Sequence, residues 1–312
     1  MSDAGTEGHG RWGAWRAIAA GPSIVCSAIV VLVATDGLGR WAVLACVGWL
    51  GCGAFTLSRT GERWVVRIGW GFRRPGPAGR ALLEPVWLEV LERTGVLESA
   101  VDLYVQAGRA VNAYAVGGRS VAVSAPLLNA YRDGRLDRAG LAAVLAHEVG
   151  HHDTHGARYV PLVLWLTLPW RVLCRVLIRV GYRLVGSQPV VPLAAVGLVA
   201  VLVGGVQLVR DRSWGAVVLV VVVLVAAAVS PLVDAAVSRA AEFAADRYAA
   251  RVGYAADLAH VLRRFDGEGQ SRTVGARLLE RHPAARDRAS RLDRAVELSG
   301  SPPAVRPASL VR

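Results

Sequence analysis

Three residues near the middle of the chain have the types and spacing of a metal-dependent hydrolytic site. His147 and His151 enclose Glu148 in the pattern His-Glu-x-x-His, which follows the apolar run 141–146. Residues four apart share one face of a helix, so both imidazoles can reach a single Zn²⁺. The Glu148 carboxylate would lie beside the open coordination position, where it can take a proton from a water that the metal activates. The alternative is a helix with two surface histidines.

A catalytic zinc site needs a third protein ligand. The metzincin pattern would require glycine at position 154 and histidine at position 157, but Thr154 and Ala157 stand there. That class is therefore excluded. His152 and His155 would point away from the face that the other two histidines share, so we interpret them as solvated or supporting residues.

Glu242 is a better candidate for the third ligand. It follows an apolar segment on an expected helix, and Asp246 lies one turn later on the same face. A carboxylate at the second position could accept the distal N–H of a ligand histidine and so fix its tautomer. From the residues alone, an ordinary charged helix face beside Arg239 and Arg247 is equally possible.

The elements that must position these residues include membrane segments. Of the 312 residues, 54% are hydrophobic, and stretches 17–35, 41–57, 190–209 and 214–233 are nearly free of charge. A bilayer core of ~30 Å requires about 20 helical residues, and none of the stretches shows a polar face. We therefore expect a mainly α membrane protein with about four transmembrane helices. The last two stretches lack the ionisable residues that a transporter or channel would need.

The strongly basic composition does not indicate nucleic-acid binding. The formal charge is +12, and the basic residues are all arginines scattered between apolar segments rather than gathered in a stripe with aromatics. Arginines before and after the first apolar pair place both of its ends in the cytoplasm. We interpret the first stretch as a retained anchor rather than a cleaved signal. The four cysteines form no CxxC pair, so neither a disulfide framework nor a cysteine zinc site is indicated.

The chain divides into six expected regions. Within the second, we expect a helix at 81–93, strands at 102–106, 110–116 and 119–124, and a cap by Asp137 on the helix that carries the histidines. The regions are 1–57, an N-terminal tail and transmembrane hairpin; 58–160, a cytosolic α+β zincin-like core; 161–189, an interfacial amphipathic segment; 190–236, a second transmembrane hairpin; 237–300, the C-terminal helical part of the catalytic domain with the third zinc ligand; and 301–312, a disordered tail.

Segment 161–189 has two interpretations. Arg171, Arg175, Arg179 and Arg183 recur every four residues, which favours a helix lying in the membrane interface. A third crossing is the rival. It would place His151 and the residues after 236 on opposite sides of the membrane, and four arginines would be costly inside the bilayer.

The motifs resemble those of the HtpX-like membrane zinc endopeptidases, gluzincins related to the CAAX prenyl endopeptidases. The matching blocks are 146–151, 238–246, 112–115 before a diglycine, and His282-Pro283 followed by Arg288. The resemblance implies that His147, His151 and Glu242 hold one Zn²⁺ per chain, that Glu148 is the general base, and that Arg288 and His282 face the site. Gly156 departs from the family, whose members often carry aspartate there.

Two interpretations of residues Asn112, Ala113, Tyr114 and Ala115 stay open. They could form a strand that pairs with an extended substrate, which the resemblance favours, or a plain sheet strand. The expected function is a multi-pass cell-membrane endopeptidase with its catalytic domain facing the cytoplasm. Its partners would be the lipid bilayer and protein or peptide substrates, mainly membrane proteins in quality control, and no nucleic acid. The alternative is a non-catalytic zinc-binding membrane scaffold or signalling protein.

Overall fold

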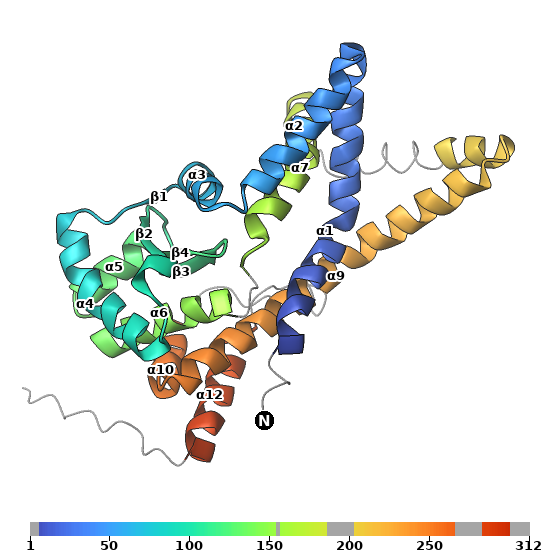
Figure 1. The fold of residues 1–312 in the computed structure, drawn as a ribbon. Coiled ribbons are helices and arrows are strands. Elements are labelled where there is room, and N and C mark those ends of the chain that lie inside the picture. The colour runs from blue at the N-terminus through green and yellow to red at the C-terminus, as the bar shows by residue number, and fades with distance from the viewer. Residues whose placement is uncertain (1–5, 154–156, 186–202, 266–282, 300–312) are drawn as a thin grey trace, which may run out of the picture. The chain divides into compact units, whose positions relative to one another are not determined.

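The computed structural model describes residues 6–153, 157–185, 203–265 and 283–299. They belong to two compact units (Figure 1). The sheet unit comprises Met1–Ala14, Phe55–Pro161 and Ala235–Arg312, and the helical unit comprises Trp15–Ala54 and Leu162–Asp234. The fold is mostly helical with one small sheet, as the sequence predicts.

The sheet has four strands in the order β1-β2-β4-β3. The strands β2 and β4 are parallel, and the other two neighbouring pairs are antiparallel. The predicted strand at 102–106 is confirmed, while the next two are shorter than predicted and enclose a three-residue turn, residues 117–119. The strand bounds are β1 Phe72–Arg73, β2 Asp102–Gln106, β3 Ala113–Val116 and β4 Ser120–Ser124.

Alternating side chains give the sheet two buried faces. Val121 and Val123 of β4 join the large core, whereas Ala122 between them joins a smaller core with Val66 of α3. The large core is built mainly from the helices that follow. The described helices of this unit are α3 (Arg59–Gly69), α4 (Pro77–Thr94), η2 (Glu98–Ala100), α5 (Ala125–Arg132), α6 (Arg138–Asp153), the last part of α9 (Trp214–Arg251), α10 (Ala255–Arg264) and α12 (Ala285–Ser299).

Helix α6, which carries the histidine pair, is fixed at its start and along its length. Asp137 caps it as predicted, since its Oδ1 accepts a hydrogen bond of 2.9 Å from the Gly140 amide. The helix packs against β3, β4, α4 and α10. Gly150 meets the backbone of α9 (Trp214–Arg251), because a Cβ at Gly150 would lie 3.1 Å from the Ala245 Cα. This close approach brings α9 beside the histidines.

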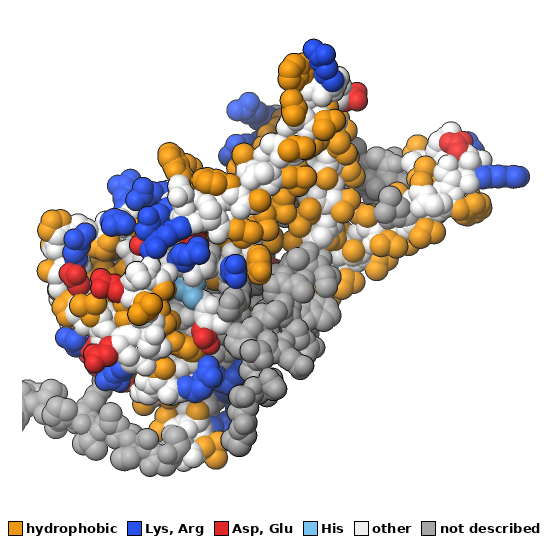
Figure 2. Space-filling model, in the orientation of Figure 1, with side chains coloured by type: hydrophobic (Ala, Val, Ile, Leu, Met, Phe, Trp, Pro, Cys, Tyr) orange, Lys and Arg blue, Asp and Glu red, His pale blue; other side chains and the backbone are white. Residues whose placement is uncertain are grey.

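In the helical unit, α7 packs against both α1 and α2. The Trp165 indole Nε1 donates a hydrogen bond of 2.9 Å to the Trp49 carbonyl. The Trp170 amide donates one of 3.1 Å to the Ser27 hydroxyl. The described helices of this unit are α1 (Thr6–Thr35), η1 (Asp36–Leu38), α2 (Trp41–Phe55), α7 (Val160–Val185) and the first part of α9. Exposed apolar side chains cover much of α1, α2 and that part of α9 (Figure 2).

Among the described residues, three helices are long and apolar enough to span a membrane. They are Ala19–Leu38, Val160–Arg183 and Trp214–Arg251. The predicted span 41–57 holds only the 15-residue α2, which qualifies only if counted with α3, bent from it by 93°. The predicted span 190–209 lies mostly outside the described residues. Helix α7 has the length and hydropathy of a span and also carries the arginine stripe, so its interfacial placement stays a prediction.

Candidate metal centre

Two imidazoles and one carboxylate meet inside the sheet unit. His147 and His151 come from α6 and Glu242 from α9, and one ligand atom from each lies within 4.8 Å of the others. The Nε2 atoms of His147 and His151 lie 3.5 and 3.7 Å from the two Glu242 carboxylate oxygens. Tetrahedral zinc with bonds of about 2.0–2.1 Å places its ligand atoms roughly 3.3–3.5 Å apart. The donor set therefore suits a zinc ion, and the two distances to Glu242 are close to this spacing.

Asp246 and Arg288 surround His147 and Glu242 with a buried network. The Asp246 Oδ1 lies 3.0 Å from the His147 Nδ1, and it also accepts a 2.6 Å hydrogen bond from the Arg288 Nη2. The Arg288 Nη1 lies 2.9 Å from the Glu242 Oε2. The contact of Nδ1 with a carboxylate favours the neutral tautomer that carries its proton on Nδ1. The Nε2 atom, which faces Glu242, is then free to bind a metal.

The pKa values of this network favour its charged form. Burial lowers the pKa of His147, but the hydrogen bonds with Asp246 and Glu242 outweigh it and raise the pKa to about 9. Burial alone would raise the pKa of Asp246, yet the hydrogen bonds from Arg288 and His147 hold it below its ordinary value. The hydrogen bonds with these two carboxylates therefore favour the protonated form of the His147 imidazole.

The remaining predicted site residues are distributed as follows. Glu148 is buried on α6 between the two histidines, and its charge acts on the guanidinium of Arg288. Ala113, Tyr114 and Ala115 lie in β3, and Asn112 directly precedes it. This segment therefore belongs to an edge strand, and β3 packs on α6. His282 and Gly156 lie outside the described residues.

The interpretation of His152 as a solvated residue is wrong. Its two ring nitrogens are buried and make no hydrogen bond of good geometry. Burial lowers its pKa to about 4, which the nearby backbone of Gly117 and Ser120 offsets only in part. Helical spacing alone could not show that His152 lies beside the hairpin turn. The turn comes from another part of the chain and reaches α6 only through tertiary packing.

The metal-binding group and its neighbouring glutamate define the class of protein as a metallopeptidase, and comparison with known families agrees. A family model for peptidase family M48 matches residues 79–296, which include the histidine pair, Glu242, Asp246 and Arg288. The chain belongs to peptidase family M48. Metallopeptidases of this family are zinc-dependent and act on proteins or peptides. A comparison with curated proteins finds no match.

Proposed function

We propose that the protein is a membrane-embedded zinc endopeptidase of the HtpX-like type, with His147, His151 and Glu242 as the ligands of one zinc ion per chain. The observation that carries this proposal is the convergence of α6 and α9, which brings the two histidines and Glu242 within 4.8 Å of one another. Membership in family M48 supports the same ligand set. Bound zinc would polarise the scissile carbonyl and acidify a water molecule.

Glu148 serves as the general base in this proposal. Its carboxylate follows a ligand histidine directly and is 7% exposed, which shields it from bulk water. It takes a proton from the attacking water and gives it to the leaving amine, so one group acts as base and then as acid. The water oxygen first forms the C–O bond to the scissile carbon, and the C–N bond breaks afterwards, when the protonated amine leaves.

Arg288 holds the two carboxylates of the site in place. Its Nε and Nη2 bond Asp246, and its Nη1 pairs with Glu242. A guanidinium has five N–H donors, so donors remain for negative charge that develops on the substrate oxygen. His282 is a second candidate for that role from its place in the family motif.

Strand β3 is the proposed docking edge for the substrate. It is one of the two edge strands of the described sheet, and it packs on the helix that carries the histidines. An extended peptide can add to such an edge through backbone hydrogen bonds, with little demand on its side chains. This suits an enzyme that cleaves varied unfolded segments.

The apolar helices support a membrane location, with substrates that are membrane proteins or segments close to the bilayer. Three described helices have the length and composition of spans. Arginines flanking α1 and α2 favour a cytoplasmic catalytic domain by the positive-inside rule. Removal of damaged membrane proteins is the role that fits this arrangement.

The test is casein cleavage by the full chain purified in detergent. Wild-type protein loaded with zinc should cleave casein, and Glu148→Gln should lose cleavage while keeping the same zinc content. Glu297→Gln, at an exposed α12 position, is the matched control and should cleave normally. Full cleavage by Glu148→Gln would contradict the assigned mechanism. Zinc binding without cleavage by any variant, with cellular function intact in Glu148→Gln, would favour the non-catalytic scaffold.

A further inference from the structure

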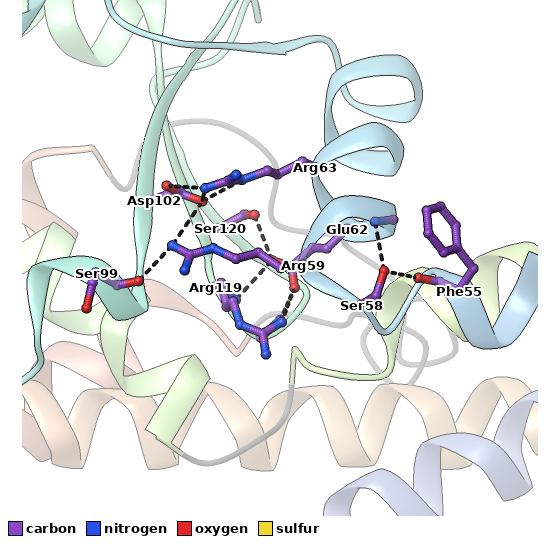
Figure 3. Close-up of polar contacts among 11 residues, drawn as sticks. Phe55, Ser58, Arg59, Glu62, Arg63, Ser99, Asp102, Arg119 and Ser120 are labelled. Atoms are coloured by element: carbon purple, nitrogen blue, oxygen red, sulfur yellow. Dashed lines mark hydrogen bonds and ion pairs between the residues drawn. The ribbon is translucent and has the colours of Figure 1, made fainter.

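A buried glutamate outside the metal group holds the turn of the β3–β4 hairpin. Glu62 lies in the first turn of α3 and is 3% exposed. Its Oε2 accepts a 3.0 Å hydrogen bond from the Gly118 amide, and its Oε1 accepts bonds of 2.9 and 2.7 Å from the Arg119 amide and the Ser120 hydroxyl. Figure 3 shows this carboxylate reaching from α3 to the turn. A buried carboxylate is costly without such partners, so α3 and the turn are held together.

The turn is shaped around this carboxylate. Gly117 has a φ of +70°, and a Cβ there would lie 2.3 Å from the Glu62 Cδ. Only glycine allows both the left-handed backbone and this approach. A glycine shaped to admit the Glu62 carboxylate would not be needed if Glu62 only capped α3. That helix already has a cap, because the Ser58 hydroxyl accepts a 3.0 Å hydrogen bond from the Gly61 amide.

Glu62 thereby fixes one end of the edge strand. The other end of β3 is tied by Ser124, whose hydroxyl accepts a 3.0 Å bond from the Asn112 amide. A cavity of about 200 Å³ lies beside the turn, lined by Glu62, Gly118 and His152 among others. That space allows the turn to shift if the bonds to Glu62 are lost.

We infer that Glu62 is a positioning residue for substrate: it holds β3 in the register and place that an extended peptide needs for edge pairing. The inference rests on the proposed function of β3. Glu62 does not contact the metal group, so its loss should weaken peptide binding without removing zinc. Charge-assisted hydrogen bonds lost at the turn should weaken binding about tenfold.

The chain offers a matched control on the same helix. Arg63 pairs with Asp102 of β2 through a 2.9 Å contact from its Nη2, so it ties α3 to the sheet without touching the turn (Figure 3). If Glu62 merely anchors α3, then Arg63→Ala and Glu62→Gln should have the same effect. If Glu62 positions β3, only Glu62→Gln should affect peptide binding.

The experiment measures binding of a fluorescent ten-residue casein peptide to zinc-loaded Glu148→Gln protein, so that no cleavage occurs. Adding Glu62→Gln should raise Kd about tenfold, at unchanged zinc content, and speed hydrogen exchange of amides 113–120. Adding Arg63→Ala should change neither. Gly117→Ala, which crowds the carboxylate, is a second variant with the same expected direction.

Unchanged Kd and unchanged exchange in Glu62→Gln, or equal effects of Arg63→Ala, would overturn the inference. Failure of the proposed function has a different signature, namely peptide binding by the parent protein without any cleavage by wild type. If the parent bound no peptide, the proposed role of β3 would fail. Unaltered hairpin exchange in Glu62→Gln would then also refute the positioning role.

Discussion

Substitution of Gly150 by alanine should separate the two helices that carry the metal group. A Cβ at this position would lie 3.0 Å from the Tyr248 Cβ and 3.1 Å from both the Cα and the carbonyl oxygen of Ala245. Two of these three atoms are backbone, so no side-chain rotation relieves the contact. Helix α9 must therefore move away by a few tenths of an ångström, and Glu242, three residues before Ala245, moves with it.

The expected cost has two parts. Overpacking of a tight contact costs about 1–3 kcal/mol, while alanine in place of glycine inside a helix contributes about 1 kcal/mol in the opposite direction. The net loss of unfolding free energy should be on the order of 1 kcal/mol. Metal sites tolerate errors of only about 0.2 Å in ligand placement, so zinc affinity should fall by about tenfold or more.

The assay is competition for zinc with a chromophoric chelator, together with thermal melts of the metal-free and zinc-loaded protein. Gly79→Ala in α4 is the matched control, because its Cβ would meet its nearest atoms at an ordinary 3.7 Å. That variant should be stabilised by about 0.5–1 kcal/mol and bind zinc normally. Wild-type zinc affinity in Gly150→Ala would refute the view that the approach of α6 to α9 builds the site.

Two further predictions concern the network around His147. Asp246→Asn should weaken zinc binding by about 10–100-fold in the chelator assay, because Asp246 orients His147. The control Asp293→Asn alters only a half-exposed ion pair with Arg263 and should bind zinc normally. The second concerns pH. The raised pKa of His147, about 9 against 6.5, stabilises the metal-free fold fully below pH 6.5, and this contribution is lost as pH rises through about 9. Zinc added at pH 7.5 should therefore release about one proton from His147, measured with an indicator dye in weak buffer, and no release would contradict the pairing.

Local patterns predicted the parts of the site that lie within one helix. The spacing of His147 and His151 and the cap by Asp137 depend only on helix geometry, and the structure contains both on α6. Strand β2 was predictable for the same reason, since the short apolar run 103–105 is a local signal. The shorter β3 was not, because its limits depend on pairing with β4.

The third ligand required more than local pattern. Glu242 and an ordinary charged residue look alike in sequence, and only the family resemblance favoured ligation. The structure supplies the missing physical reason, which is the close approach of α9 at Gly150.

Glu62 and His152 were beyond the reach of sequence patterns. Each is buried by a hairpin turn that comes from a separate part of the chain, so no spacing rule applies. The membrane helices were only partly predictable as well. By length and hydropathy, α7 is one of the three described helices that could span a membrane. Its arginine stripe, in contrast, favours a place in the membrane interface.

Zinc content per chain tests the central claim most directly. The claim is that His147, His151 and Glu242 together hold one metal ion. Metal analysis of the purified full chain should give one zinc per wild-type chain and little or none in Glu242→Ala after dialysis. Zinc retained at full stoichiometry and wild-type affinity in Glu242→Ala would contradict the account.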